Sequence, residues 1–280
     1  MRRNSGRNKI FREIIFHVLI IVGAIIVIFP TIYMFSASFM SLDQIFSTPI
    51  HIFPLKLHFE NYREVFVQFA LHRYFLNSTF VVIVVLLFNI FFCPLVGYSL
   101  AKFRFPGRDF LFIFTLCTMM IPFNIIVIPL YLTIRTFGWI NTYQGLVAPQ
   151  IIIPFGIFLM RQFIQGIPND YLDAARIDGC SEFRIFYQII LPLSTPAIVA
   201  LSIVTFVGNW NSFLWPLIVL TSDAKQTLPI ALAKFLSNYA NEWHLLMTAS
   251  VVASSPILLF FFLFNRGFIE GMTGLSGLKG

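Results

Sequence analysis

Long apolar stretches alternate with short polar segments along most of the chain. Six stretches contain no Asp, Glu, Lys or Arg and are long enough to cross the hydrocarbon of a bilayer, which takes roughly 17–25 residues of helix. They are 14–35, 76–101, 110–132, 144–160, 193–220 and 245–264. The pattern predicts an all-α, polytopic membrane protein with six transmembrane helices, in a single transmembrane domain that covers residues 1–280.

Two of these stretches depart from the usual length. The fourth is short, and the fifth is long enough to be tilted or broken. Five prolines lie within spans, where neighbouring helices can satisfy the backbone groups that a proline frees: Pro94, Pro122, Pro129, Pro154 and Pro256. The first stretch is longer than the apolar core of a signal peptide, so it is expected to be a span.

The charge pattern sets the orientation. Apolar residues make up 58% of the 280 residues and charged residues 11%, which excludes an ordinary soluble domain. With the N-terminus inside, 13 of the 19 Lys and Arg residues lie on the cytoplasmic side. Both termini are therefore expected to be cytoplasmic. The net charge of +7 reflects this bias and does not indicate nucleic-acid binding.

The chemistry that is missing narrows the function further. The spans carry no acidic or basic residue besides His17, so a proton-coupled transporter would lack the relay that carries its protons. Sodium-coupled transport, with sodium bound by backbone carbonyl groups, stays open. No phosphate-binding loop is present. The three cysteines and five histidines show no ligand spacing, so no metal site is expected. We expect a transporter energised by a partner; the alternatives are a self-sufficient secondary transporter or channel and, third, a membrane enzyme.

The largest predicted cytoplasmic segment, 161–192, contains a short helix. Pro168 and Asn169 are typical of a helix start, and Gly179 stands where a left-handed C-terminal residue is expected. The helix of two to three turns would carry on one face Tyr171, Ala174, Ala175 and Asp178. A second stretch begins near Ser181, with a stripe of Phe183, Phe186, Tyr187 and Ile190. The first helix is either a connector on the membrane surface or a docking helix.

The spacing within this segment resembles a known signature. Asp173-Ala174-Ala175 is followed after three residues by Gly179 and, nine residues later, by Ile189-Ile190-Leu191-Pro192. This resembles the EAA signature of binding-protein-dependent ABC importer permeases. The one departure is Asp173 in place of Glu, which keeps the charge but shortens the reach of the carboxylate by one methylene.

Other segments extend the resemblance over nearly the whole chain. They are 60–62, 128–131, 137–142, 210–217, 227–229 and 270–280. Several of them resemble the carbohydrate class, in particular the second permease subunit of maltose-type importers. The resemblance implies a type I permease core in the cytoplasmic (inner) membrane of a prokaryote. It also implies that this chain is not an enzyme and binds no cofactor itself, with ATP and Mg held by the partner ATPase.

The resemblance also implies partners and roles for residues. The partners are an ATP-binding cassette ATPase dimer, a second permease subunit that is a different chain, an extracytoplasmic solute-binding protein and the lipid bilayer. The coupling helix seated on the ATPase would use Tyr171, Leu172, Asp173, Ala174, Ala175, Asp178 and Gly179. Gly271, Thr273 and Lys279 would run along the ATPase pair; the alternative is a frayed terminus.

The translocation path must be lined by neutral polar groups. Amides offer a donor and an acceptor to hydroxyl groups, and an indole face suits the C–H side of a sugar ring. The candidates are Asn89, Asn124, Asn209, Trp210 and Asn211, with Thr118 and Ser212 beside them. Asn89 and Asn124 could equally bond neighbouring helices. Trp215 is expected in the aromatic belt at the outer interface. A neutral polyhydroxy solute, a sugar or a sugar-like compound, fits spans without charges.

Overall fold

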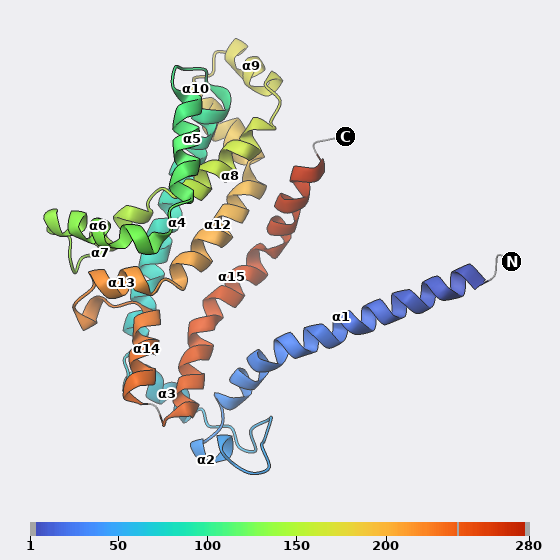
Figure 1. Cartoon of the computed structure of the whole chain (residues 1–280), viewed down its shortest axis with the longest axis vertical. Helices are drawn as coiled ribbons and strands as arrows, with labels where there is room; N and C mark the ends of the chain where they lie inside the picture. Colours follow the sequence, from blue (N-terminus) through green and yellow to red (C-terminus); the bar gives the residue numbers. More distant parts are fainter. Residues whose placement is uncertain (1–3, 240, 278–280) are drawn as a thin grey trace. The chain divides into compact units, whose positions relative to one another are not determined.

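The computed structural model describes residues 4–239 and 241–277, and the side chains of 12–237, 239 and 241–264. These residues form helices and connections, with no strand among them (Figure 1). The long helices are α1 (Asn4–Ala37), α4 (Leu71–Lys102), α5 (Arg108–Met119), α6 (Phe123–Thr136), α8 (Pro154–Gln165), α12 (Thr195–Trp210), α14 (Leu228–Asn238) and α15 (Trp243–Gly277). The short ones are α2 (Leu42–Ile45), α3 (Glu60–Val67), α7 (Tyr143–Val147), α9 (Asp170–Ile177), α10 (Glu182–Ile185), α11 (Leu191–Leu193) and α13 (Leu214–Val219). The all-α prediction is confirmed.

Four helical segments within the described part are long and apolar enough to span a membrane unaided. They are Arg12–Ala37, Leu71–Lys102, Tyr143–Gln165 and Trp243–Phe264. Two bent pairs pass the same test, α5 with α6 and Glu182–Leu193 with α12. The number of spans reaches the expected six only when each bent pair counts as one.

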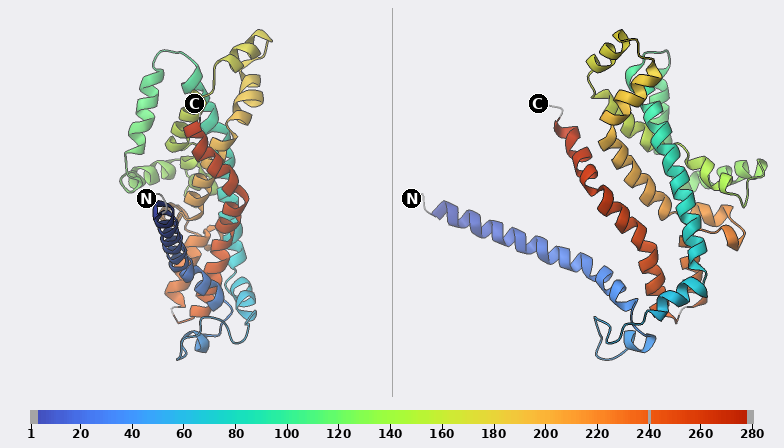
Figure 2. Two further views of the ribbon diagram at one scale, coloured as in Figure 1. Left: turned by 90° about the vertical axis from the view of Figure 1, so that its right-hand side faces the viewer. Right: turned by 180° about the vertical axis from the view of Figure 1, so that it is seen from behind.

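The predicted third span, 110–132, is broken into two helices. α5 and α6 meet at an angle of 104°, and Figure 2 shows α6 turning away from the direction of α5. The break falls at Pro122, whose ψ of 136° is extended. Proline has no N–H for the helix and disfavours the helical conformation in Ile121 before it. With 12 residues, α5 is about 18 Å long and too short to cross alone.

The predicted fourth and fifth spans are also interrupted. In the fourth, α7 passes through a 3-10 turn at Ala148–Gln150 before α8 begins at Pro154. In the fifth, α12 ends at Trp210, and the separate helix α13 begins at Leu214. The expectation that the long fifth stretch is tilted or broken is confirmed as a break.

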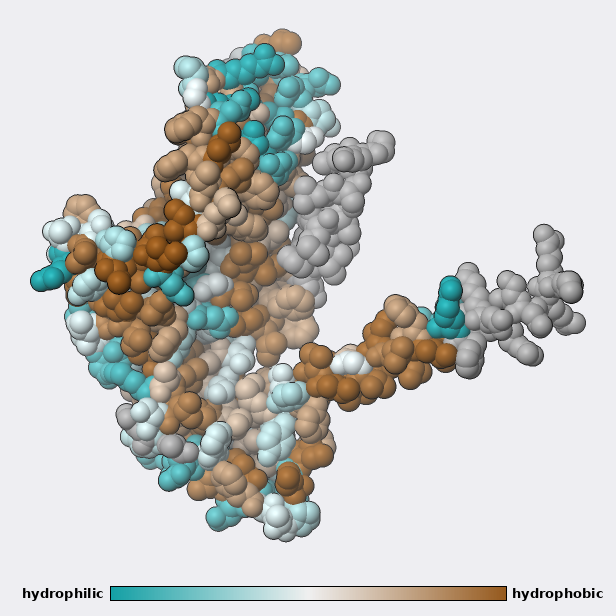
Figure 3. All heavy atoms as spheres, in the orientation of Figure 1, coloured by the Kyte–Doolittle hydropathy of each residue, from teal (hydrophilic) through white to brown (hydrophobic). Residues whose placement is uncertain are grey.

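The chain divides into two compact units, and each is described by itself. The first comprises residues up to Leu71 together with Lys234–Ser254. From Ile14 to Ile32, α1 exposes apolar side chains, seen as brown atoms in Figure 3, as a helix surrounded by lipid would. At the end of α1 the turn Ser38–Met40 is held by the Asn61 amide, which donates to Ser38 O and Met40 O at 3.0 and 2.9 Å.

The second unit comprises His72–Ala233 and the residues from Ser255 onward. Its helices α4, α8 and α12 pack closely because glycines remove the side chains at their contacts. A Cβ on Gly97 of α4 would lie 2.8 Å from Met160 Cβ, and a Cβ on Gly156 of α8 would lie 2.6 Å from Cys93 Sγ. Small residues at helix contacts are typical of membrane bundles. The core built on these contacts extends to α9 and α10.

Candidate functional site

α9 begins and ends where the sequence predicts. It starts at Asp170 after Asn169 and runs for eight residues, about two turns. Gly179 takes a left-handed φ of 80°. The Gly179 N–H donates to Arg176 O at 3.0 Å and the Cys180 N–H donates to Ala175 O at 2.9 Å, a Schellman motif. The motif satisfies the last carbonyl groups of α9 and turns the chain sharply toward α10.

The two faces of α9 have different environments. Leu172 and Ala175 are buried in the core of the second unit, and burial of Leu172 stabilises the attachment by roughly 2 kcal/mol. The expected grouping of Ala175 with Tyr171, Ala174 and Asp178 on one face is therefore wrong, because the core binds the Ala175 side. The exposed face carries Tyr171, Ala174, Ile177 and Asp178, which we name the α9 outer face.

Ile177 is the residue of this face that the sequence reasoning missed. Its side chain is 87% exposed, the highest value among the exposed large apolar side chains of the described residues. The available signal was a large apolar residue in an otherwise polar and small-residue stretch. Together with the exposed Tyr171, Ile177 gives the α9 outer face an apolar character that is available for a contact with another molecule.

Ion pairs hold α9 against α10. Arg176 lies 3.0 Å from Asp173 Oδ1 and 2.7 Å from Glu182 Oε1. Tyr98 of α4 donates its hydroxyl to the other Glu182 oxygen at 2.7 Å. The hydrogen bond from Arg176 lowers the pKa of the Glu182 carboxyl, so the bridge persists at neutral pH and is lost as the pH falls through that lowered value. Asp173, at the signature's acidic position, therefore pairs within its own chain.

The start of α9 is tied to the end of α4. Lys102, the last residue of α4, donates through Nζ to Ile167 O and, at 2.9 Å, to Asn169 Oδ1. The Lys102 ammonium group therefore connects the last turn of α4 to the loop that leads into α9. The start of α9 is thus linked directly to a long helix of the same unit.

A π-helical turn at Phe186–Ile190 splits the apolar stripe predicted after Ser181. Phe186 and Ile190 are buried in the core, whereas Phe183 and Tyr187 are exposed. Figure 3 shows polar side chains gathered at the end of the second unit that carries α9 and α10. The exposed aromatic residues lie at that same end, within the segment next to α9.

A hollow of about 830 Å³ lies beside the break between α5 and α6. It brings together four polar side chains, Thr118, Asn124, Gln150 and Ser212. Apolar side chains make up most of the remaining lining, as in many small-molecule sites. Of the residues predicted to line the translocation path, Asn124, Thr118 and Ser212 line this hollow.

Asn89 has a different setting. It is fully buried, and its amide donates to Val85 O at 2.9 Å and to Gln150 O at 2.7 Å. Its Oδ1 accepts from the Ile153 N–H at 3.1 Å. Gln150 O and the Ile153 N–H are backbone groups freed where the fourth span is interrupted, whereas Val85 O belongs to the same helix as Asn89. Of the two interpretations open for Asn89, the bonding of neighbouring helices matches the structure.

Three other candidates also lie outside the hollow. The Asn209 and Asn211 amides donate to carbonyl groups of their own helix, Thr205 O and Val207 O. Trp210 is buried between Phe75 and Phe206, at centroid distances of 5.5 and 5.8 Å. All three lie at the end of α12, next to the break before α13.

Trp215 corrects one expectation. We expected it in the interfacial belt, but it is 3% exposed and its indole N–H donates to Leu146 O at 3.2 Å. The break at Asn211–Phe213 turns α13 inward, so Trp215 packs on Phe123 instead of facing lipid. It also forms part of the wall of the 830 Å³ hollow.

The predicted tail contacts are largely outside the described part. Gly271 and Thr273 fall within the backbone of α15, but their side chains lie outside the described residues, and so does Lys279 altogether. Among the residues that are described, no group of three or more His, Cys, Asp or Glu side chains is arranged to hold a metal ion.

Comparison with known proteins identifies the family. The model of the family described as "Binding-protein-dependent transport system inner membrane component" matches residues 94–273. The arabinooligosaccharides transport system permease protein AraQ of Halalkalibacterium halodurans is 38% identical over 260 residues, covering 92% of this chain and 93% of that protein. The sn-glycerol-3-phosphate transport system permease protein UgpE of Brucella abortus is 36% identical over 270 residues, covering 93% and 95%.

A solved structure supports the fold. A chain of a bacterial ABC transporter involved in the import of the acidic polysaccharide alginate superposes with a TM-score of 0.84 at 23% identity, covering 94% of this chain and 98% of that one. The expected importer-permease fold is thereby confirmed. The matched region includes α9, the interrupted spans and the 830 Å³ hollow. The chain belongs to the family of binding-protein-dependent transport system inner membrane components.

Proposed function

We propose that this chain is the permease subunit of an ATP-driven importer that takes a neutral oligosaccharide from an extracytoplasmic binding protein into the cytoplasm. The relatives named above transport arabinooligosaccharides or sn-glycerol-3-phosphate, and the solved neighbour is involved in import of alginate. The two latter solutes are anionic. Spans without acidic or basic residues favour the neutral one, and the polar groups of the 830 Å³ hollow suit hydroxyl groups.

The α9 outer face is the observation that carries the mechanism. It exposes Tyr171, Ala174 and Ile177 on a helix fixed by a buried inner face, an ion-pair network and Lys102. In this proposal the face sits in a groove of the ATPase, which binds ATP and Mg. Closure of the ATPase dimer moves α9, and Lys102 passes that movement to α4. The population of transporter molecules then shifts from the inward-facing to the outward-facing state. Both termini are cytoplasmic.

The docking proposal is tested with Ile177→Glu in the complete transporter. A carboxylate buried against the ATPase at the most exposed apolar position of the α9 outer face should abolish co-purification of the ATPase, or uncouple ATP hydrolysis from the loaded binding protein. The matched control is Ile50→Glu, which places the same charge on an exposed apolar residue between the first two predicted spans, on the side opposite to the N-terminus. Normal uptake and normal ATPase assembly in Ile177→Glu would contradict the proposal.

The solute proposal is tested separately by ligand retained on the purified cognate binding protein. A neutral oligosaccharide identified by mass spectrometry is the expected result. In uptake assays Asn124→Leu should raise the KM for that sugar, whereas Asn211→Leu, whose amide bonds its own helix, should leave the KM unchanged. A retained phosphate ester or uronate polymer would contradict the choice of a neutral solute.

A further inference from the structure

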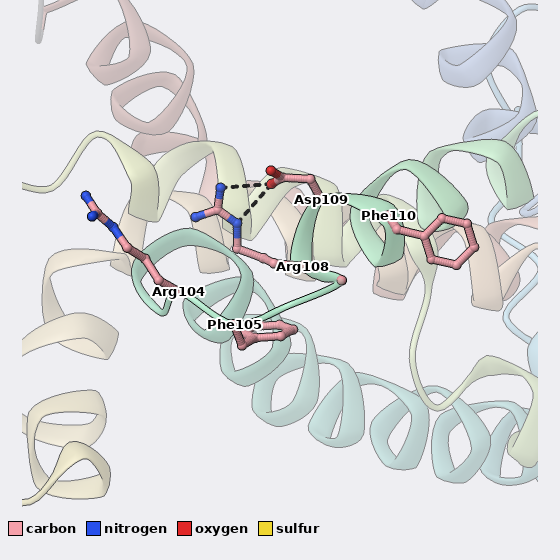
Figure 4. Close-up of a pocket in the computed structure, with 6 residues that line it drawn as sticks. Arg104, Phe105, Arg108, Asp109 and Phe110 are labelled. Carbon is pink, nitrogen blue, oxygen red and sulfur yellow. Dashed lines mark hydrogen bonds and ion pairs between the residues drawn. The ribbon is translucent and has the colours of Figure 1, made fainter.

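The connection between α4 and α5 folds around a second hollow of about 540 Å³. It is lined by Arg104, Phe105, Gly107, Arg108, Asp109 and Phe110 (Figure 4). Gly107 has a left-handed φ of 84°, which reverses the chain within a few residues. Arg104 and Arg108 therefore border one hollow, although they lie on either side of the turn.

The hollow carries an excess of positive charge. Arg108 is paired with Asp109, with Nη2 at 2.8 Å from Oδ1. Arg104 has no hydrogen-bond or ion-pair partner among the side chains that the structure describes. Arg161 interacts electrostatically with both Arg108 and Asp109, and its guanidinium lies 3.7 Å from the Phe112 ring centroid. The two arginines that line the hollow thus have a single carboxylate beside them, and Arg161 adds a third positive charge near Arg108 and Asp109, so the arrangement favours an anion.

Exposed aromatic side chains continue from this hollow along α5. Phe110 is 69% exposed and Phe114 is 60% exposed, with ring centroids 6.5 Å apart in a stacked arrangement. α5 is the first half of a bent span that starts at the hollow, so this row of rings leads from a charged rim toward the hydrocarbon. A soluble anion would contact the arginines but leave the aromatic row unused.

We propose that the Arg104–Arg108 hollow binds the headgroup of an anionic phospholipid, with its acyl chains along Phe110 and Phe114. The guanidinium groups of Arg104 and Arg108 contact the phosphodiester, a pairing that arginine's planar donor fork favours. Basic pockets between transmembrane helices on the cytoplasmic side suit such headgroups. Asp109 competes with the lipid for Arg108 and limits its affinity.

Native mass spectrometry of the complete, detergent-purified transporter tests this proposal. The complex is offered equal amounts of phosphatidylglycerol and phosphatidylethanolamine, and the ratio of retained lipids is measured. We expect Arg104→Gln/Arg108→Gln to lower the preference for phosphatidylglycerol by at least about tenfold. Asp109→Asn should raise it. Arg104→Lys/Arg108→Lys preserves the charge and should keep most of the preference for phosphatidylglycerol. This variant replaces the Gln variant in the test if the Gln variant assembles poorly.

Two controls separate this site from general electrostatic attraction. Arg12→Gln/Arg184→Gln removes two arginines from the same predicted side and should leave the lipid ratio unchanged. Excess inorganic phosphate should not displace the lipid, because phosphate makes no contact with the aromatic row. An equal loss in the control variant, an unchanged ratio in Arg104→Gln/Arg108→Gln, or displacement by phosphate alone would overturn the proposal.

Discussion

At the scale of single residues, the amides of this chain divide by what their hydrogen bonds already do. Asn89 bonds one backbone N–H and one carbonyl group at the interruption of the fourth span, and a second carbonyl group in its own helix. Asn124 lines the 830 Å³ hollow instead. Both are lone amides in apolar stretches, so their type and position could not separate these roles. The difference depends on where the neighbouring span is broken.

Asn89→Leu tests the structural role. The change leaves Gln150 O and Ile153 N without their partner in a buried site, and we expect a loss of about 2–4 kcal/mol in stability. Thermal unfolding of the purified complex measures the loss. Asn211→Leu is the control, because the Asn211 amide is exposed and bonds only to Val207 O. Equal melting temperatures for the two variants would contradict this role for Asn89.

Gly179→Val tests the backbone at the end of α9. A Cβ at Gly179 meets no atom within 4 Å, so the penalty comes from φ of 80° and not from a clash. A β-branched residue in this conformation costs about 1–2 kcal/mol or more, whereas Asn adopts it readily. We expect Gly179→Val to lose ATP hydrolysis stimulated by the loaded binding protein and Gly179→Asn to keep it. Equal stimulation in both variants would show that the left-handed turn is not required.

At the scale of elements, the corner between α9 and α10 is a small rigid body. Arg176→Leu removes both of its ion pairs, which are partly exposed and together contribute about 1 kcal/mol. We expect hydrogen exchange of the backbone amides in α9 to accelerate roughly five-fold, measured by mass spectrometry on the transporter. Arg184→Leu is the matched control, since the Arg184 side chain donates only to Gln188 of the same segment. Acceleration in both variants alike would contradict the corner's dependence on Arg176.

The same elements show how far the sequence predicts the fold. Apolar runs located the spans, and Asn169 and Gly179 located both ends of α9, because these signals are local. The break at Pro122 was not expected, since a proline inside a bundle is often tolerated. The buried side of α9 could not be predicted either: Leu172, Ala175 and Ile177 are all compatible with either face of so short a helix. The rest of the chain decides which of them the core accepts.

At the scale of the whole molecule, the bent pair α5–α6 determines how the chain crosses the membrane. If the pair crosses once, residues 137–142 lie outside while α9 lies inside, and the predicted excess of Lys and Arg falls on the cytoplasmic side. If α5 and α6 form a re-entrant loop, residues 137–142 lie on the same side as Arg108. The number of crossings then changes, and every later segment is assigned to the opposite side.

Thr136→Cys, in a background with Cys117→Ser and Cys180→Ser, distinguishes these topologies. Thr136 is exposed near the end of α6. We expect a membrane-impermeant maleimide to label this cysteine in cells whose cell wall or outer membrane has been removed and whose cytoplasmic membrane is intact. Ser181→Cys, exposed just before α10, should be labelled only after the membrane is opened. Since the proposed docking of α9 requires the cytoplasmic side, the labelling of Ser181→Cys tests the position of the inner side separately from Thr136→Cys. Protection of Thr136→Cys in intact cells would make α5–α6 re-entrant and contradict a six-span permease with both termini inside.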